Sequence, residues 1–234
     1  MALPRLNDKP KYDLVIPSTG QQVRFRPYLV KEEKVLMMAI ESKDQAQALN
    51  AVVDTLEACI EDSIDKSVLK VFDIEYMFLM IRSKSVGETS TVTVKCKDCE
   101  TENELVIPLS DIPVPKIEHD GVIQIESDIT LKMGYPVWTD MLNMQEEGKS
   151  ETEQTFAMIA ACCNVLETAE ERFDLKDEPL SEIENFIDSL SSPQFEKIKD
   201  FVQNMPRLEK DVSFACQGCA AKNEMMLRGL DDFF

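Results

Sequence analysis

The chain reads VTVKCKDC at residues 92–99 and NELVI at 103–107, and it repeats this arrangement as VSFACQGC at 212–219 and NEMML at 223–227. The two segments match position by position at a constant offset. Each copy has an alternating strand pattern, a Cys-x-x-Cys turn, a short polar link and a second apolar strand. Each copy therefore predicts a β-hairpin whose tip presents two thiols.

Two such tips supply four sulfurs, the number that a tetrahedral structural zinc site requires. The gap between the two pairs far exceeds the usual zinc-finger spacing, so the second hairpin must return in space to the first. Because all four positions are thiolates, no open position remains for water or substrate, and the expected zinc is structural. The predicted ligands are Cys96, Cys99, Cys216 and Cys219.

Two other interpretations of these cysteines are open. They could be unrelated pairs of buried thiols, although unrelated pairs need not share a flanking pattern. They could also be redox-active, but the thiol pKa of a redox Cys-x-x-Cys is lowered at a helix N-terminus, and these pairs follow strand patterns. The repeated context favours zinc over both alternatives.

The composition restricts the class of partner. The chain has 234 residues, of which 44% are hydrophobic, enough for one large or two small domains with a sizeable core. It carries 44 acidic residues against 25 basic ones, a formal net charge of -19. Such a surface repels nucleic acids and anionic membranes and is compatible with a basic protein partner, although the charge could also serve solubility alone.

The chain shows no pattern that is typical of an enzyme. Its single histidine, His119, lies in a turn pattern, and there is no glycine-rich phosphate loop. Paired acids such as Glu146-Glu147 are interpreted as solvated surface. We therefore expect no enzymatic activity, no catalytic residues and no small-molecule substrate.

The seven cysteines bear on the cellular compartment. The chain shows no secretory signal and no apolar run of about 20 residues. We therefore expect synthesis in a reducing cytoplasm, which favours metal binding over disulfides.

The predicted fold class is α+β: an N-terminal β-hairpin plus helices, a helical insertion, and a composite zinc ribbon from the two Cys-x-x-Cys hairpins. The insertion is expected to contain a proline-marked connector, a small hairpin near 122–133, and helices at about 152–166, 181–190 and 193–204. The expected divisions are an N-terminal hairpin at 1–28, a helical region at 29–85, the first zinc hairpin at 86–107, the insertion at 108–207, and the second zinc hairpin with the tail at 208–234.

Three features are candidates for contact surfaces. The basic loop at 82–88 is a local exception on an acidic chain, and it is either a docking point or a charge near a helix C-terminus. The terminal phenylalanines either insert into a partner or, as we favour, fold back on the zinc hairpin. The pair Met37-Met38 could form an adaptable surface, but a core position is expected. The candidate partner-binding residues are Arg82, Lys84, Phe233 and Phe234.

Beyond the cysteine hairpins, the chain carries several further short segments, namely IPSTG at 16–20, RFRP at 24–27, KEEK at 31–34, DIEY at 73–76 and RSKSVGE at 82–88. Together with the hairpins, from residue 11 to 234, they resemble the baseplate hub proteins of T-even-like contractile-tailed bacteriophages (myoviruses). The resemblance implies a structural or assembly protein of the tail baseplate hub, located in the virion, synthesised in the host cytoplasm and bound to other baseplate and hub proteins. It leaves open whether the protein stays in the finished tail.

Two alternative functions are kept beside this one. The first is a zinc-ribbon adaptor that binds a basic host protein through the acidic surface and is absent from virions. The second is a thiol oxidoreductase that uses one Cys-x-x-Cys, with a low thiol pKa and no bound metal.

Overall fold

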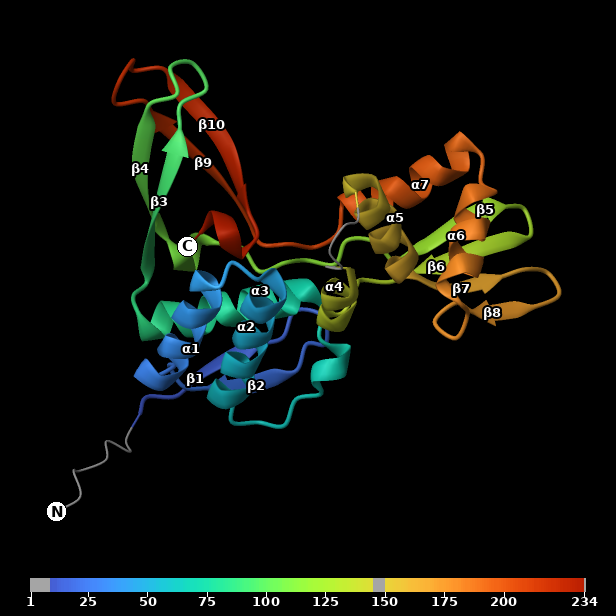
Figure 1. Cartoon of the computed structure of the whole chain (residues 1–234), viewed down its shortest axis with the longest axis horizontal. Coiled ribbons are helices and arrows are strands. Elements are labelled where there is room, and N and C mark those ends of the chain that lie inside the picture. The colour runs from blue at the N-terminus through green and yellow to red at the C-terminus, as the bar shows by residue number, and fades with distance from the viewer. Residues whose placement is uncertain (1–8, 145–149, 234) are drawn as a thin grey trace. The chain divides into compact units, whose positions relative to one another are not determined.

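The protein is described by a computed structural model, which places residues 9–144 and 150–233. The chain divides into two compact units. Unit 1 consists of Met1–Asp65, Phe72–Lys116 and Arg207–Phe234, and unit 2 consists of Lys66–Val71 and Ile117–Pro206. Both units contain helices and small antiparallel sheets (Figure 1). The structure therefore confirms a mixed α+β fold.

Unit 1 begins with a short β-hairpin, as the sequence predicts. Strands β1 (Tyr12–Val15) and β2 (Gln22–Phe25) pair in antiparallel fashion. The turn between them closes where the N–H of Gly20 donates to the carbonyl oxygen of Ile16 at 2.9 Å. Gly20 has a φ of 69°, a left-handed conformation that glycine adopts without strain.

Three helices follow, in the region that the sequence predicts to be helical: α1 (Val30–Glu41), α2 (Gln45–Cys59) and α3 (Val71–Ser85). The side chain of Asp44 caps α2 by accepting the N–H of Gln47 at 3.1 Å. Helix α3 is buried on most of its surface, as its apolar composition predicts. Its buried apolar residues are Phe72, Ile74, Met77, Phe78, Leu79 and Ile81.

The two cysteine segments form two hairpins of the same design. They consist of β3 (Thr89–Lys95) with β4 (Glu102–Pro108), and of β9 (Glu209–Ala215) with β10 (Lys222–Arg228). Each strand has seven residues, and the two hairpins share the same register. The hairpins lie side by side, with their turns at the same end (Figure 1).

One apolar cluster, here called the hairpin core, packs the hairpins at the end opposite their turns. It joins both hairpins to Leu79 of α3 and to the chain after the short 3-10 helix η2 (Leu109–Asp111). Its other buried members are Val92, Val94, Ile107, Leu109, Ile112, Leu208, Val212, Leu227 and Phe233. Residues from both sides of the insertion therefore pack into one core.

Unit 2 contains a four-stranded antiparallel sheet in the order β5-β6-β7-β8. Its strands are β5 (Val122–Glu126), β6 (Ile129–Met133), β7 (Cys163–Glu167) and β8 (Arg172–Asp174). Its helices are α4 (Trp138–Met144), α5 (Glu151–Cys162), α6 (Leu180–Asp188) and α7 (Ser192–Gln203). The hairpin near 122–133 and the last two helices are confirmed.

The helix that the sequence predicts over 152–166 is wrong in its last part. Helix α5 ends at Cys162, and the next residues form β7, which pairs with β6. Gly134 permits this pairing, because a Cβ at that position would lie 2.1 Å from the side-chain nitrogen of Asn164. A short apolar run fits a helix or a buried strand equally well, and here the sheet pairing decided.

The core of unit 2 lies between this sheet and the helices. Leu131 of β6, Ile159 of α5 and Ile198 of α7 have almost no exposed surface. Cys162 and Cys163 are also buried in this cluster, as the sequence predicts. Unit 2 therefore has a continuous apolar core.

Candidate metal site

The two Cys-x-x-Cys turns close by the same hydrogen bonds. In the first, the N–H of Cys96 donates to the carbonyl oxygen of Thr101 at 3.0 Å, and the N–H of Glu100 donates to the carbonyl oxygen of Cys96 at 3.0 Å. The second turn repeats both bonds at 2.9 Å with Cys216, Ala220 and Ala221. Glu100 and Ala220 both adopt a positive φ, at 57° and 60°. The repeat in the sequence is therefore a repeat in backbone conformation.

The four predicted cysteines meet at the hairpin tips. Their Sγ atoms all lie within 4.8 Å of one another. Two of the contacts cross between the hairpins, with Cys96 and Cys219 at 3.8 Å and Cys99 and Cys216 at 3.5 Å. A tetrahedral ion with metal–sulfur bonds of about 2.3 Å sets its sulfurs about 3.8 Å apart. The spacing of the four sulfurs therefore suits a tetrahedral metal ion.

Each hairpin contributes one buried and one exposed thiol. Cys96 and Cys216, directly after β3 and β9, are 2% and 3% exposed. Cys99 and Cys219 are exposed. A metal bound here would be covered from the side of the hairpins and would lie close to solvent on the other side.

Two asparagines cross between the hairpins. Asn223 of β10 accepts the N–H of Lys97 at 2.9 Å, and its side-chain nitrogen donates to the sulfur of Cys96 at 3.3 Å. Asn103 of β4 accepts the N–H of Gln217 at 2.8 Å, and its nitrogen lies 3.8 Å from the sulfur of Cys216. Each hairpin therefore orients the buried cysteine of the other.

These two asparagines are not among the site residues predicted from the sequence. They are almost fully buried, at 2% and 3% exposure. The signal that could have identified them is the Asn-Glu pair at the same place in both repeats, because a shared polar residue inside a strand pattern needs a buried partner.

Backbone N–H groups favour the thiolate form of the buried cysteines. The N–H of Asp98 donates to the sulfur of Cys96 at 3.4 Å, which lowers the pKa of that thiol. Hydrogen bonds from the N–H groups of Cys219 and Gly218 lower the pKa of Cys216 to about 6, against the effect of burial. These hydrogen-bond donors stabilise a negative charge on sulfur.

The pKa of Cys219 is shifted in the opposite direction. The N–H of Ala221 acts to lower the pKa of Cys219, but the neighbouring sulfurs, first that of Cys99, raise it to about 12. Four thiolates at this spacing repel one another, so they cannot all ionise without a cation among them. A divalent metal ion would supply the missing positive charge.

One contact between the tips requires glycine. A Cβ at Gly218 would lie 2.6 Å from the hydroxyl oxygen of Thr101. In the repeat, Gly218 corresponds to Asp98, and Thr101 corresponds to Ala221. The two tips therefore differ in sequence at the positions of this contact.

The candidate partner-binding residues Arg82 and Lys84 lie on the last turn of α3. Lys84 forms an ion pair with Glu88, and its Nζ lies 5.4 Å from the ring centroid of Tyr12. Burial lowers the pKa of Arg82. Both residues therefore have structural contacts within unit 1, and their role toward a partner stays a prediction.

Phe233 lies in the hairpin core and has no exposed surface. Its carbonyl oxygen accepts a hydrogen bond from the hydroxyl of Ser90 on β3. Phe233 therefore folds back on the hairpins, as favoured above, and its role toward a partner stays a prediction. Phe234 lies outside the described residues.

Unit 2 contains a cavity of about 520 Å³, lined by residues that include Ala157, Ala160, Cys163 and Leu175. Burial raises the pKa of Cys163 to about 12, so this thiol is a poor nucleophile at neutral pH.

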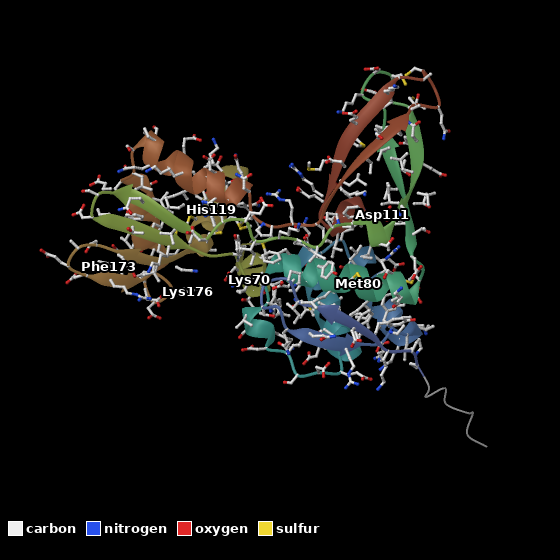
Figure 2. All side chains as sticks on the ribbon, turned by 180° about the vertical axis from the view of Figure 1, so that it is seen from behind. Lys70, Met80, Asp111, His119, Phe173 and Lys176 are labelled. Carbon is white, nitrogen blue, oxygen red and sulfur yellow. The ribbon has the colours of Figure 1, made fainter. Side chains whose placement is uncertain are left out.

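His119 (labelled in Figure 2) is exposed, and its Nδ1 accepts the N–H of Gly121 at 3.0 Å. These contacts are those of a turn residue.

Within residues 9–144 and 150–233, no helix combines the length and the apolar character that crossing a membrane requires. Neither a similar curated protein nor a similar solved structure was found. One family does match: the profile of "T4 bacteriophage base plate protein" covers residues 9–234. This match confirms the phage baseplate part of the resemblance described above, and the chain belongs to the T4 bacteriophage base plate protein family.

Proposed function

We propose that this protein is a structural or assembly protein of the baseplate hub, and that one structural zinc ion fixes the shape of its unit 1. Family membership supports a structural role in the phage tail. The hub assignment rests on the sequence resemblance. The observation that carries the zinc proposal is the meeting of four cysteine sulfurs within 4.8 Å at the tips of two hairpins.

Zinc is the metal that this donor set favours. Tetrahedral sites made of four cysteines are typical of structural zinc and leave no position for a substrate. The ligands are Cys96, Cys99, Cys216 and Cys219, with Asn103 and Asn223 as the groups that orient the buried sulfurs. Loss of such an outer contact typically weakens metal binding by about 10–100-fold.

The ion would join two parts of the chain that are distant in sequence. Cys96 and Cys219 are separated by 123 positions, and unit 2 is inserted between the two hairpins. Bringing such distant segments together has an entropic cost that the metal–ligand bonds offset. The result is a rigid pair of hairpins that can present a constant surface to neighbouring baseplate proteins. The net charge of -19 disfavours nucleic acid as the partner.

The first test is elemental analysis of the reduced, purified chain, together with its mass under native conditions. We expect one zinc per monomer. Zinc found only in an oligomer would mean that the metal bridges chains. The absence of any metal, with four freely titratable thiols, would overturn the zinc proposal and return the four cysteines to redox chemistry or to a plain packing role.

The second test concerns the hub. In cells infected with a phage that lacks this protein, we expect the central hub to be missing while peripheral baseplate parts still assemble. The wild-type chain supplied from a plasmid should restore the hub. Normal baseplates in its absence would contradict the proposal and favour the host-directed adaptor, which does not require the protein in the tail.

A further inference from the structure

Helix α1 exposes large apolar side chains to solvent. Val30, Met37, Met38 and Ile40, here called the α1 stripe, are 65%, 56%, 70% and 70% exposed. Val35, on the same helix, is 49% exposed. The sequence-based expectation of a core position for Met37-Met38 is therefore wrong. Single exposed apolar residues are ordinary, but a group of this size on one short helix marks a contact surface.

The inner face of α1 is narrow and partly ionic. It buries Leu36, Ala39 and Glu32. Glu32 forms an ion pair with Arg26 at 2.8 Å and accepts the N–H of Leu29 at 2.9 Å. A surface helix normally turns its apolar stripe to the core and its charges to water. Helix α1 places more large apolar side chains outside than inside, as a helix does when it is covered on both faces.

The spacing of the α1 stripe fits another helix. Val30, Met37 and Ile40 stand seven and three residues apart, so they lie along one side of the helix as in a helix–helix seam, and Met38 lies on the adjoining side. Two acids, Glu33 and Glu41, and one base, Lys34, lie along the same side of the helix and are exposed. Methionine side chains adapt to the shape of the helix that packs on them.

We propose that the α1 stripe is the docking site for an amphipathic helix of another baseplate protein, with basic residues beside its apolar stripe. This inference rests on the assembly role proposed above and assigns it a surface and a class of partner. The basic residues would pair with Glu33 and Glu41. A second copy of this chain is a poorer occupant, because each copy carries a net charge of -19 and the two would repel. The same charge opposes docking to an anionic membrane.

The test pairs a disruptive variant with a matched control. Met37→Lys combined with Ile40→Lys removes apolar contact and adds positive charge that repels a basic helix. Val122→Lys, at an exposed apolar position on β5 of unit 2, is the control. Each variant is mixed in turn with the purified baseplate proteins of the same phage. We expect the α1 variant to bind its partner at least about tenfold more weakly, the loss typical of an interface hot spot, and the control to bind normally.

Cross-linking identifies the occupant. A photoreactive residue in place of Met37 should join a basic, amphipathic segment of one baseplate protein, and the same residue at position 122 should not. Cross-links to a second copy of this chain would overturn the proposal, as would no cross-link above that from position 122. Zinc content is measured on the same samples. One zinc per chain without cross-linking would overturn the docking site alone, whereas no zinc with normal cross-linking would overturn the metal site alone.

Discussion

Unit 2 and the paired hairpins of unit 1 are held together by different means. Unit 2 packs a sheet and helices around a continuous apolar core that includes Leu131, Ile159 and Ile198. The hairpins share an apolar core only at the end near α3. At their tips they contact each other through cysteine sulfurs and two asparagines.

The difference follows from how much surface each region can bury. A two-stranded hairpin is marginal by itself in water, because it has one thin face to pack. The two hairpin tips extend beyond the apolar core and bury too little surface to form a core of their own. A metal ion bound by cysteines can join them instead. The comparison predicts that changes at the tips act on the metal and the hairpins, and that changes in unit 2 do not.

The largest effect is expected when the buried ligands are removed. Cys96→Ser combined with Cys216→Ser should abolish metal binding and lower the free energy of unfolding of unit 1 by several kcal/mol, a part of the roughly 10–16 kcal/mol that structural zinc supplies in small domains. Hydrogen exchange measures this effect: amides of β3, β4, β9 and β10 should exchange faster, and those of β5 to β7 should not. Cys162→Ala, a buried cysteine outside the cluster, should keep the metal. Equal loss of protection in both units would contradict the comparison.

A change in the core of unit 2 should do the reverse. Ile198→Ala leaves a cavity beside the sheet, because this side chain is fully buried. We expect a loss of about 2–5 kcal/mol in the free energy of unfolding, measured by urea denaturation of unit 2 signals such as Trp138 fluorescence. The metal content should stay the same as in the unchanged chain. A fall in metal content would show that the two regions are coupled.

The asparagines should have an intermediate effect, and an equal one. Asn103→Ala and Asn223→Ala each remove a hydrogen bond to a backbone N–H and an orienting contact to a buried sulfur. We expect each to weaken metal binding by about 10–100-fold, measured by competition with a chelator. Glu104→Ala, at the exposed neighbouring position, is the control. A loss of metal affinity for only one of the two variants would contradict the view that both asparagines position the sulfurs.

The smallest effect is expected in the pH dependence of stability, and it comes from the carboxyl group of Glu75 on α3. Burial raises the pKa of Glu75 on α3 to about 7, although the N–H groups of Leu208 and Leu230 act to lower it. The folded state therefore holds this proton more tightly than the unfolded state does. The resulting stability is complete below about pH 4.5 and is lost as the pH rises toward 7.

Glu75→Gln tests this dependence, because glutamine imitates the protonated form at every pH. Urea denaturation at intervals from pH 5 to 8 should show a smaller decrease in stability for the variant and a higher stability than the unchanged chain above pH 7. Glu104→Gln, which alters an exposed carboxylate, should leave the profile as it is. Parallel profiles for Glu75→Gln and the unchanged chain would contradict the assignment.

Much of the fold could be predicted because it depends on local pattern. Alternation gave the hairpins at 11–28 and 122–133, and helical spacing gave α1, α2, α6 and α7. The prediction was wrong at β7, where an apolar run left helix and strand equally possible, and it missed β8, whose three residues are too few to show a period.

By itself, the sequence determined that two hairpins each carry two thiols, since a repeat with strand alternation and a fixed Cys spacing is a local property. Only the tertiary structure decided that Cys96 lies against Cys219, that Asn103 and Asn223 cross between the hairpins, and that Met37 and Met38 face solvent. These features depend on which distant segments meet. A periodic pattern shows that a helix has an apolar face, but what lies against that face is fixed by the packing of the whole chain.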